Sequence, residues 1–552
     1  MSATIVPARH QPPLPLERMI LREPAGAEAT PLDVLFVGAG PAGLAGAIRL
    51  AQLVREDAAA GGGLGAVEIG VLEKAGALGE HSLSGAVVDP RPFRRLFPEL
   101  DESDLPFRGA VGAERVYLLT ERRRFRVPLP REMRNHGNRV ASICEIVRWL
   151  GERAEGLGVN IFTGFPAAAL LTEGDRVTGV RTTPSGLGRD GRPGGGYAPP
   201  NDLTARVTVL ADGTRSALAQ AWLEWQGIRS ANPQIYALGV KELWEVPRAP
   251  DAVIHTLGWP LPSDAFGGSW CYPMGERLVS LGLVVGLDYR QHALDVHALL
   301  QRLKTHSLFA PTLTGGTLVE WGAKTIPEGG LHSLPERLHG AGLLVAGDAA
   351  GLVNVAALKG IHHAMHSGQL AAEAIFAALK ADDVSAAALA GYDAALHASS
   401  VIDDLRRTRN MRLAFKSGFA LGGLKAWLMD LTRGAFPGGR IAAEADAATP
   451  RRIVARAAAE PVAPGGISKL DAVFRSGNAT RDDVPSHLVV GDDVPAEVAE
   501  FYQQLCPAGV YERDGDRLVV RAPNCVDCKA TDVLGPRWTP REGGSGPSYK
   551  RM

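Results

Sequence analysis

The sequence predicts an α/β chain with several domains, and two observations near its start carry this prediction. A short apolar run from Val34 to Val37 is typical of a buried parallel strand, and the Ala- and Leu-rich stretch after it predicts a helix. A Gly-x-Gly-x-x-Gly hexad, residues 38–43, stands between the two. Strand, glycine turn and helix in this order are the context in which the hexad binds the pyrophosphate of a dinucleotide. The chain is therefore expected to contain a Rossmann-like domain.

The residues of the hexad have separate tasks. Gly38 permits a tight turn, Gly40 lets the backbone approach a pyrophosphate, and Gly43 allows the helix to pack closely on the strand. Pro41 and Ala42 open the helix, whose N-terminal N–H groups and partial positive charge face the phosphates. We expect all five residues to bind the cofactor. An ordinary buried strand–helix unit with a glycine-rich turn is the alternative at this point.

A second predicted strand, residues 67–74, ends in Glu73 and Lys74. A carboxylate at this strand end can accept hydrogen bonds from both hydroxyls of an adenosine ribose. The interval from Gly43 to Glu73 is longer than the usual spacing of about 20 residues. Residues 58–63, three alanines followed by three glycines, explain the excess as a flexible loop before the strand.

Two later stretches complete a flavin-binding pattern. Ser84 and Gly85 belong to a loop of small residues that suits close passage past a flat ring system. A further buried strand delivers Gly347 and Asp348, whose carboxylate can bind ribityl hydroxyls, and Gly360 precedes a helix whose N-terminus would face the pyrimidine end of the flavin. The three elements in this order predict FAD rather than NAD, bound by a domain of the glutathione-reductase/hydroxylase type.

Composition narrows the possible classes. The 552 residues carry a formal net charge of −1, so we expect no nucleic-acid partner. Five unevenly spaced cysteines do not form a secreted disulfide framework, and no run of about 18 apolar residues predicts a membrane-spanning helix. Residues 1–31 lack the apolar core of a signal peptide, and we interpret them as a mobile tail on a cytosolic protein. The preference for Ala, Gly and Arg is typical of a bacterial chain from a GC-rich genome.

Three histidines, His362, His363 and His366, lie on the helix that follows Gly360. Histidines at this spacing can bind a metal ion when acidic side chains assist them. Because the pattern shows no acidic partner, we interpret them as helical surface residues and not as ligands.

Apolar side chains dominate residues 413–434. Leu424, Leu428 and Leu431 share a helical face, with Trp427 beside them. Two interpretations are open from the pattern alone. The stretch is either a core helix or an interfacial segment that dips into one leaflet of a membrane, with lysines and Trp427 at the headgroup level.

The last part of the chain contains Cys506-Pro507 and the pair Cys525-x-x-Cys528. This cysteine pattern is typical of a ferredoxin-like iron–sulfur site, in which four thiolates normally bind the cluster. The next position in a C-x-x-C-x-x-C pattern is Thr531, so the sequence supplies three ligand cysteines. The remaining cysteines, Cys144 and Cys271, are expected to be small core residues.

From Asp33 to Met552 the chain resembles the electron-transfer-flavoprotein:ubiquinone oxidoreductases. The resemblance is carried by long strings in the order of the family, at residues 37–44, 73–74, 83–86, 135–138, 239–244, 255–261, 281–289, 506–511 and 542–547. It implies an FAD enzyme that takes electrons from reduced electron transfer flavoprotein and delivers them to membrane ubiquinone. It also implies a quinone-binding role for Gly267 and Gly268, an iron–sulfur cluster on the three cysteines, and membrane attachment through residues 413–434.

The resemblance further implies a domain organisation and a location. We expect an FAD-binding domain at 32–235 and 338–400, a sheet-rich quinone-binding domain at 236–337, a membrane-surface segment at 401–460 and a ferredoxin-like iron–sulfur domain at 461–552. The expected location is the cytoplasmic face of a bacterial inner membrane, as a peripheral, monotopic protein.

The chain departs from the family at two places. Residues 130–134 are polar where relatives carry a Leu/Pro-rich apolar loop, which predicts a shallower membrane contact. Thr531 stands where the final cluster cysteine is expected. Asp532 or Asp527 would then supply a carboxylate ligand, a [3Fe–4S] cluster would replace [4Fe–4S], or the cluster would be lost.

Two other functions compete with quinone reduction. One is a soluble NAD(P)H-dependent flavoprotein reductase or hydroxylase, although the sequence shows no second Gly-x-Gly-x-x-Gly for a nicotinamide cofactor. The other is a scaffold that has lost its cluster and only docks a partner. Intact Gly38, Glu73 and Asp348 argue against the scaffold.

Overall fold

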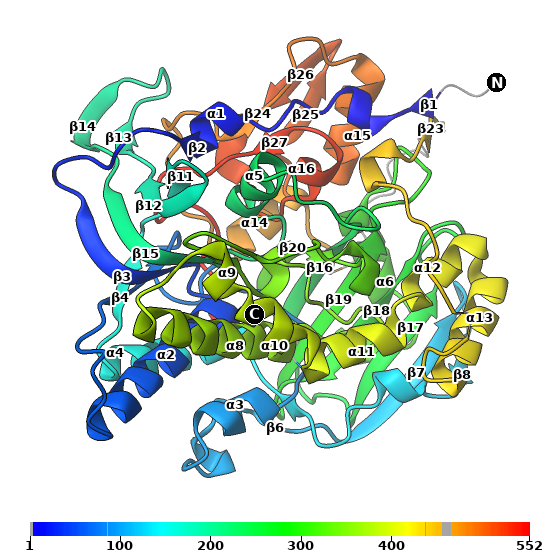
Figure 1. Cartoon of the computed structure of the whole chain (residues 1–552). Helices are drawn as coiled ribbons and strands as arrows, with labels where there is room; N and C mark the ends of the chain where they lie inside the picture. Colours follow the sequence, from blue (N-terminus) through cyan, green and yellow to red (C-terminus); the bar gives the residue numbers. More distant parts are fainter. Residues whose placement is uncertain (1–3, 86, 437, 455–464) are drawn as a thin grey trace.

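The computed structural model describes residues 4–85, 87–436, 438–454 and 465–552 (Figure 1). A nine-stranded sheet organises the first half of the chain, in the order β10-β4-β3-β15-β12-β11-β2, with β22 beside β15 and β21 beside β22. Its strands are β2 (Ile20–Leu21), β3 (Thr30–Val37), β4 (Ile69–Glu73), β10 (Asn160–Thr163), β11 (Ala167–Glu173), β12 (Arg176–Thr182), β15 (Asp202–Leu210), β21 (His339–Gly340) and β22 (Leu343–Val345).

The centre of this sheet is parallel. Strands β10, β4, β3, β15 and β22 pair in parallel, and β3, β4 and β22 contain buried apolar runs because both faces of the sheet are covered there. Helix α2 (Pro41–Ala59) packs against α4 (Ile143–Gly156) and α8 (Ile361–Lys380), as Figure 1 shows. The ends of three strands that carry predicted site residues therefore meet at one edge of the sheet.

A seven-stranded sheet forms the second layer, in the order β20-β16-β19-β18-β17-β7-β8. Its strands are β7 (Ala113–Leu119), β8 (Arg124–Val127), β16 (Tyr236–Glu245), β17 (Ala252–Gly258), β18 (Gly267–Pro273), β19 (Leu278–Gly286) and β20 (Thr317–Pro327). All pairs are antiparallel except β17 with β7. Strands β7 and β8 come from the stretch that we assigned to the first domain, so they extend the second sheet beyond the expected range.

The N-terminal stretch differs from the expected mobile tail. Strand β1 (Thr4–Ile5) pairs with β23 (Arg451–Arg452), and β2 joins the edge of the large sheet. Ile5 and Met19 are each 3% exposed. The expectation is wrong for residues 4–31, because a few apolar side chains among the prolines find buried positions that the composition of the stretch does not reveal.

The C-terminal part is a small unit of short elements. It comprises α14 (Lys469–Arg475), β24 (Leu488–Val489), α15 (Ala496–Leu505), β25 (Tyr511–Asp514), β26 (Arg517–Val520), α16 (Ala530–Leu534) and β27 (Arg537–Trp538). Phe501, Leu505 and Val526 share one apolar core with Leu238 and Val240 of the second sheet. This shared core holds the cysteine-bearing loops against the sheet.

Helix α13 (Phe419–Leu431) lies at the periphery next to α12 (Met411–Ala414) and α11 (Ser400–Thr408), as Figure 1 shows. Met429 anchors it, packed against Met411 and Ala414. Its opposite side exposes Leu421, Leu424, Trp427 and Leu431 at 51–58%. The core-helix interpretation is therefore wrong, since the apolar face points outward, although Leu428 is half-buried. Among the described residues, no helix has the length and apolar character needed to cross a membrane.

The remaining elements complete the surface. They are the helices α1 (Leu16–Met19), α3 (Arg91–Leu96), α5 (Ala217–Trp225), α6 (Val296–Lys304), α7 (Ala310–Leu313), α9 (Ala386–Leu389) and α10 (Gly391–His397), and the strands β5 (Val87–Val88), β6 (Gly109–Ala110), β9 (Arg139–Val140), β13 (Ser185–Leu187) and β14 (Pro193–Ala198). Strands β13 and β14 form the hairpin that the Gly- and Pro-rich stretch after residue 185 predicts.

Candidate functional site

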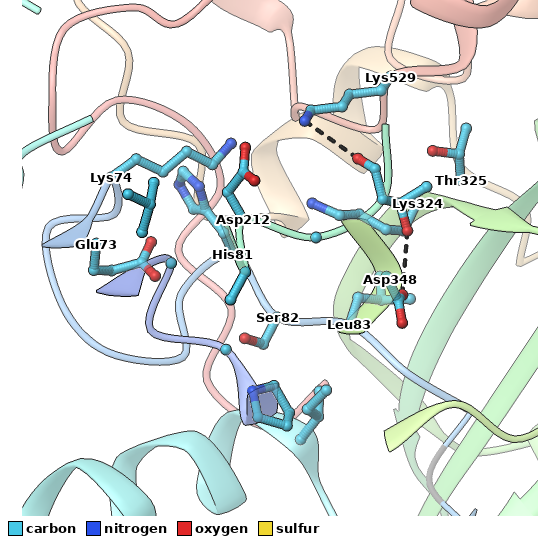
Figure 2. Close-up of a pocket in the computed structure, with 18 of the residues that line it drawn as sticks. Glu73, Lys74, His81, Ser82, Leu83, Asp212, Lys324, Thr325, Asp348 and Lys529 are labelled. Carbon is cyan, nitrogen blue, oxygen red and sulfur yellow. Dashed lines mark hydrogen bonds between the residues drawn. The ribbon is translucent and has the colours of Figure 1, made fainter. Parts of the chain in front are cut away.

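A cavity lies where β3, β4 and β15 end, and we call it the dinucleotide cavity (Figure 2). The structure brings eight of the predicted cofactor residues to its wall, namely Gly38, Gly40, Pro41, Glu73, Lys74, Ser84, Gly85 and Asp348. The other four stand behind the wall. A Cβ on Gly347 would lie 2.9 Å from the Cβ of Ala42, Gly43 packs on Gly38, and a Cβ on Gly360 would lie 3.7 Å from Asp348 Oδ1.

The three glycines of the hexad have the geometry that their tasks require. Gly38 has φ +107°, and a Cβ there would lie 2.5 Å from the carbonyl oxygen of Ala211. A Cβ on Gly43 would lie 2.0 Å from the carbonyl oxygen of Gly38, which only direct contact between helix and turn explains. A Cβ on Gly40 would meet nothing within 4 Å. The backbone at Gly40 thus faces open space that a phosphate group can occupy.

Two buried carboxylates stand along the cavity. Glu73 accepts hydrogen bonds from the backbone N–H groups of Ala39 at 3.2 Å and Ala75 at 2.8 Å. Asp348 accepts one from the hydroxyl of Thr214 at 3.2 Å, the contact drawn at Asp348 in Figure 2. Burial raises the pKa of both Glu73 and Asp348. Each carboxylate has lone pairs left for sugar or ribityl hydroxyls, which would offset the cost of burying it.

Two lysines of the dinucleotide cavity, Lys324 and Lys529, are not among the cofactor-binding residues predicted from the sequence. Lys324 comes from β20, and Lys529 follows Cys528; Figure 2 shows both facing the same space as Lys74, His81 and Asp212. Lys529 Nζ donates to the carbonyl oxygens of Thr214 at 3.2 Å and Arg215 at 3.1 Å. Burial and the neighbouring Lys74 lower the pKa of Lys324 and of Lys529 to about 8. Lysines gathered in this way suit an anionic ligand such as a pyrophosphate. No local motif marks them.

Cys506, Cys525 and Cys528 converge on a second, small cavity, which we call the three-cysteine cavity. The backbone N–H of Val510 donates to Cys506 Sγ at 3.5 Å, and the amides of Asp527 and Ala530 bond to the sulfurs of Cys525 and Cys528. Asp527 and Lys529 have positive φ angles of 53° and 63°, which close the loop around the sulfurs. All three cysteines are free and buried. Converging sulfurs that accept amide hydrogen bonds fit an iron–sulfur cluster.

The fourth position beside these sulfurs is occupied by Thr531, which lines the same cavity. The expected carboxylate substitutes do not line it. Asp532 accepts hydrogen bonds from Arg215 Nε at 2.7 Å and from the Trp538 backbone N–H at 2.9 Å. Asp527 pairs with Lys74 at 2.6 Å and Arg541 at 2.9 Å. Asp527 Oδ1 also accepts a hydrogen bond from Cys525 Sγ at 3.7 Å. Both carboxylates are thus held in ion pairs and neither lines the cavity, so the expectation that either one ligates a cluster is not supported.

The two cavities are neighbours. The backbone N–H of Thr325 donates to the carbonyl oxygen of Cys528 at 3.0 Å, and Thr325 lines the dinucleotide cavity. Lys529, the residue after Cys528, lines both cavities. A group held by the cysteines is therefore connected to the dinucleotide cavity through one hydrogen bond and a short covalent path.

A third cavity, of about 970 Å³, lies beside the start of α13. Leu257, Leu261, Phe266, Gly267 and Phe415 form its apolar part, and Asp288, Arg290, Arg412 and Lys416 give it a charged part. Gly268 does not line it, because its Cβ position lies 2.5 Å from the carbonyl oxygen of Thr256 in the next strand. Close strand packing is thus sufficient to explain a glycine at 268.

Two of the three histidines of α8 differ from their expected surroundings, whereas His366 is half-buried and contacts Arg95. His362 and His363 are buried, and Asp404 of α11 lies 3.4 Å from His363 Nε2 and 4.0 Å from His362 Nε2. They are not surface residues, and they do have an acidic partner. Asp404 also pairs with Arg407 of its own helix, so the carboxylate joins α8 to α11 through its hydrogen bond with His363.

Comparisons with known proteins identify relatives over nearly the whole chain. Residues 236–326 match the family model described as ETF-QO, ubiquinone-binding, and residues 466–550 match the model described as electron transfer flavoprotein-ubiquinone oxidoreductase, 4Fe-4S. The mitochondrial electron transfer flavoprotein-ubiquinone oxidoreductase of Oryza sativa subsp. japonica is 37% identical over 553 residues, covering 96% of this chain and 94% of that protein. The Homo sapiens protein of the same name is 37% identical, covering 94% and 89%.

Solved structures share the fold of about three quarters of the chain. A geranylgeranyl bacteriochlorophyll reductase-like protein from Thermoplasma acidophilum aligns with a TM-score of 0.57 at 20% identity, covering 73% of this chain and 92% of that one. A flavin-dependent brominase aligns with a TM-score of 0.50 at 16% identity, covering 73% and 94%. At these identities the likeness shows the fold alone. The predicted fold class, a mixed α/β chain with a flavoprotein-type domain, is confirmed.

Proposed function

Since the chain belongs to the electron transfer flavoprotein-ubiquinone oxidoreductase family, we propose that it oxidises reduced electron transfer flavoprotein and reduces ubiquinone. The observation that carries the proposal is the hydrogen bond between Thr325 and Cys528, which joins the dinucleotide cavity to the three-cysteine cavity. An enzyme that passes single electrons between two centres requires them to be close, and one hydrogen bond separates the walls of these two sites.

The residues of the dinucleotide cavity would bind FAD in a fixed orientation. The turn at Gly38 and Gly40 receives the pyrophosphate, Glu73 the adenosine ribose and Asp348 the ribityl chain. Lys324 and Lys529 face the negative charge of the ligand. When bound, FAD supplies chemistry in both one-electron and two-electron steps, and an iron–sulfur cluster supplies one-electron steps.

The cavity beside α13 would admit the quinone. Its apolar side chains suit the quinone ring and isoprenoid tail of ubiquinone, and its position at the base of an outward-facing apolar helix supports entry from a membrane. Gly267, which lines this cavity, has φ +150° and would place a Cβ 2.0 Å from the carbonyl oxygen of Val284. Of the two glycines that the family resemblance assigns to the quinone, Gly267 is therefore the one with access to it.

We also propose that α13 attaches the protein to the cytoplasmic face of a bacterial inner membrane. The four exposed side chains Leu421, Leu424, Trp427 and Leu431 form one apolar face, which suits a helix lying in the membrane interface. The bacterial placement rests on the Ala-, Gly- and Arg-rich composition of the chain.

The catalytic proposal is tested by anaerobic turnover. The purified protein is mixed with chemically reduced electron transfer flavoprotein and a short-chain ubiquinone analogue, and ubiquinone reduction is followed by its ultraviolet absorbance. We expect reduction that depends on the flavoprotein donor. Bleaching of the flavin by NADH or NADPH alone, without turnover from the donor, would instead support a soluble reductase or hydroxylase. A colourless protein would support the docking scaffold.

Membrane attachment is tested by replacing Leu424, Trp427 and Leu431 with Ser and measuring flotation with anionic and neutral vesicles. Each buried apolar side chain contributes about 1.5–3 kcal/mol at most, so the triple variant should lose binding while high salt releases little wild-type protein. Leu470→Ser with Phe474→Ser is the matched control, since these apolar side chains are exposed elsewhere, on α14. Release of the wild type by salt alone would contradict an apolar contact.

A further inference from the structure

The residues that line the three-cysteine cavity carry three sulfurs and two hydroxyl groups. Cys506, Cys525 and Cys528 supply the sulfurs, and Thr531 on α16 lines the same cavity. The Thr531 hydroxyl lies 3.4 Å from the hydroxyl of Tyr511, which is 1% exposed and lines the cavity as well. Besides the three sulfurs, the cavity is therefore lined by two hydroxyl oxygens and by no fourth thiolate.

We propose that the cluster in this chain is held by three thiolates, and that its fourth iron faces the Thr531 hydroxyl and is exchangeable. The inference deepens the proposed function, because it assumes that the protein carries the iron–sulfur cluster of its family. A neutral hydroxyl is a much weaker ligand for iron than a thiolate. The iron at that corner should therefore leave and return while the other three stay bound.

The acidic neighbours do not supply a stronger fourth ligand. Both oxygens of Asp532 are engaged, by Arg215 and by the Trp538 backbone N–H. The Asp527 carboxylate is held by Lys74, Arg541 and the Trp538 indole N–H at 2.6–3.0 Å. To reach the cavity, either carboxylate would have to leave a buried cation without its partner, which typically costs about 3–5 kcal/mol.

His487 is a further candidate for the fourth ligand. It is buried, and neither of its ring nitrogens has a hydrogen-bond partner. Its ligand atom lies within 4.8 Å of those of Cys525 and Asp527, and it does not line the three-cysteine cavity. Its position beside Cys525 would direct it to the iron that Cys525 already binds, not to the iron at the opposite corner.

The exchange step balances as follows. [4Fe–4S]²⁺ releases Fe²⁺ and gives one electron to an added oxidant such as ferricyanide, leaving [3Fe–4S]⁺. Adding Fe²⁺ with a one-electron reductant reverses it. No cysteine–iron bond is broken in either direction, and Thr531 keeps its hydroxyl proton.

The test uses anaerobically purified holoprotein in four forms: wild type, Thr531→Cys, Thr531→Val and Val533→Cys. Ferricyanide is added in steps, and iron per flavin and the [3Fe–4S]⁺ electron paramagnetic resonance signal are measured. Val533→Cys is the matched control, because Val533 lies on the same short helix and is buried but does not line the cavity. We expect the wild type, Thr531→Val and Val533→Cys to lose about one iron of four and to develop the signal, and Thr531→Cys to retain all four.

Two outcomes would overturn the inference. In the first, the wild type keeps four irons as firmly as Thr531→Cys, which would mean that another residue supplies the ligand; loss of the fourth iron in His487→Gln would identify it. In the second, none of the four proteins holds iron. Donor-dependent ubiquinone reduction is measured on the same samples, so that a failure of the proposed function, with the iron results as expected, is recognised separately.

Discussion

The dinucleotide cavity is formed mainly by main-chain atoms and the three-cysteine cavity mainly by side chains, although one hydrogen bond joins the walls of the two. The first is formed mainly by main chain at the ends of parallel strands, with glycines at 38, 40 and 43 where the backbone turns or approaches a neighbour. The second depends on a few side chains that project from short loops, Cys506, Cys525 and Cys528. The first site uses the geometry of a large sheet, whereas the second uses the chemistry of individual atoms.

This difference determines how each site responds to substitution. A main-chain site keeps its shape when exposed side chains change, because the sheet and helix α2 hold the backbone. A side-chain site changes its chemistry with a single residue, as Thr531 illustrates. The same contrast predicts that damage at the dinucleotide cavity can be separated into loss of ligand and loss of fold, and that damage at the three-cysteine cavity can leave the fold intact.

The largest expected effect is at Gly40. The backbone there, at φ −79° and ψ −178°, is open to any residue, and a Cβ meets nothing within 4 Å. Gly40→Val should therefore fold with nearly unchanged thermal stability, while its side chain occupies the place of the pyrophosphate. We expect FAD affinity to fall on the order of a hundredfold or more, measured by fluorescence titration of the apoprotein.

Gly43→Val is the control that separates the two kinds of damage. Its Cβ would lie 2.0 Å from the carbonyl oxygen of Gly38, so helix and turn must move apart. Overpacking of this kind costs about 1–3 kcal/mol or more, and chemical denaturation should detect it. A Gly40→Val protein that retains full yellow colour would contradict the assignment of the pyrophosphate to Gly40. The dinucleotide cavity could then not be described as a site formed by the main chain at this turn.

The dinucleotide site could largely be predicted from sequence, because its residues stand at fixed intervals around one strand–turn–helix unit. Glu73 ends β4 and Asp348 closely follows β22, two parallel strands of one sheet, so local patterns were sufficient to find them. Lys324 and Lys529 could not be found this way. Lys324 lies on β20 and Lys529 directly follows Cys528, and only the tertiary fold brings these two segments to the cavity.

Other errors have the same physical origin. Ile5 and Met19 are isolated apolar residues in a Pro-rich stretch, and their burial depends on surfaces contributed by distant elements. His362 and His363 lie on α8, and their acidic neighbour Asp404 belongs to α11. The interfacial interpretation of residues 413–434 could be proposed from the sequence because the leucines of its apolar face lie within a single helix. Contacts between residues that are far apart in the sequence cannot be predicted from the spacing of residues within one segment.

Asp527 tests whether the two sites share one support. Its carboxylate links Lys74, on the wall of the dinucleotide cavity, to Arg541 and to the loop that carries Cys525. Asp527→Asn keeps the shape but leaves two cations without a buried counter-charge. We expect unfolding free energy to fall by about 3 kcal/mol or more and iron to be lost more readily in denaturant.

The control for this prediction is Asp483→Asn. Asp483 pairs with Arg481 at 2.9 Å, but its side chain is 69% exposed, so solvent replaces the lost contact. Its stability should lie within error of the wild type. Equal stability of the Asp527 and Asp483 variants would mean that the buried pair does not hold the two sites together.

The last expected effect is a pH dependence, at a residue that packs behind the three-cysteine cavity. Asp446 belongs to the short turn that contacts α16. It accepts a hydrogen bond from the Tyr236 backbone N–H at 2.7 Å, and its other oxygen has no partner in the described structure. Burial, with a further contribution from Asp288, raises the pKa of Asp446 to about 8.

The sign of the effect follows from proton binding. An unfolded aspartate titrates near its ordinary pKa of about 3.9, so between that value and pH 8 the folded protein holds one proton more than the unfolded protein. Stability contributed by this group is complete below about pH 4 and is lost as pH rises toward 8, with a slope of about 1.4 kcal/mol per pH unit at most. Asp446→Asn resembles the protonated acid and removes this slope. Denaturant unfolding at pH 5, 6, 7 and 8 should therefore show the variant gaining on the wild type as pH rises. Parallel curves for the two proteins would mean that Asp446 is ionised in the fold, and that the turn behind α16 holds a charge.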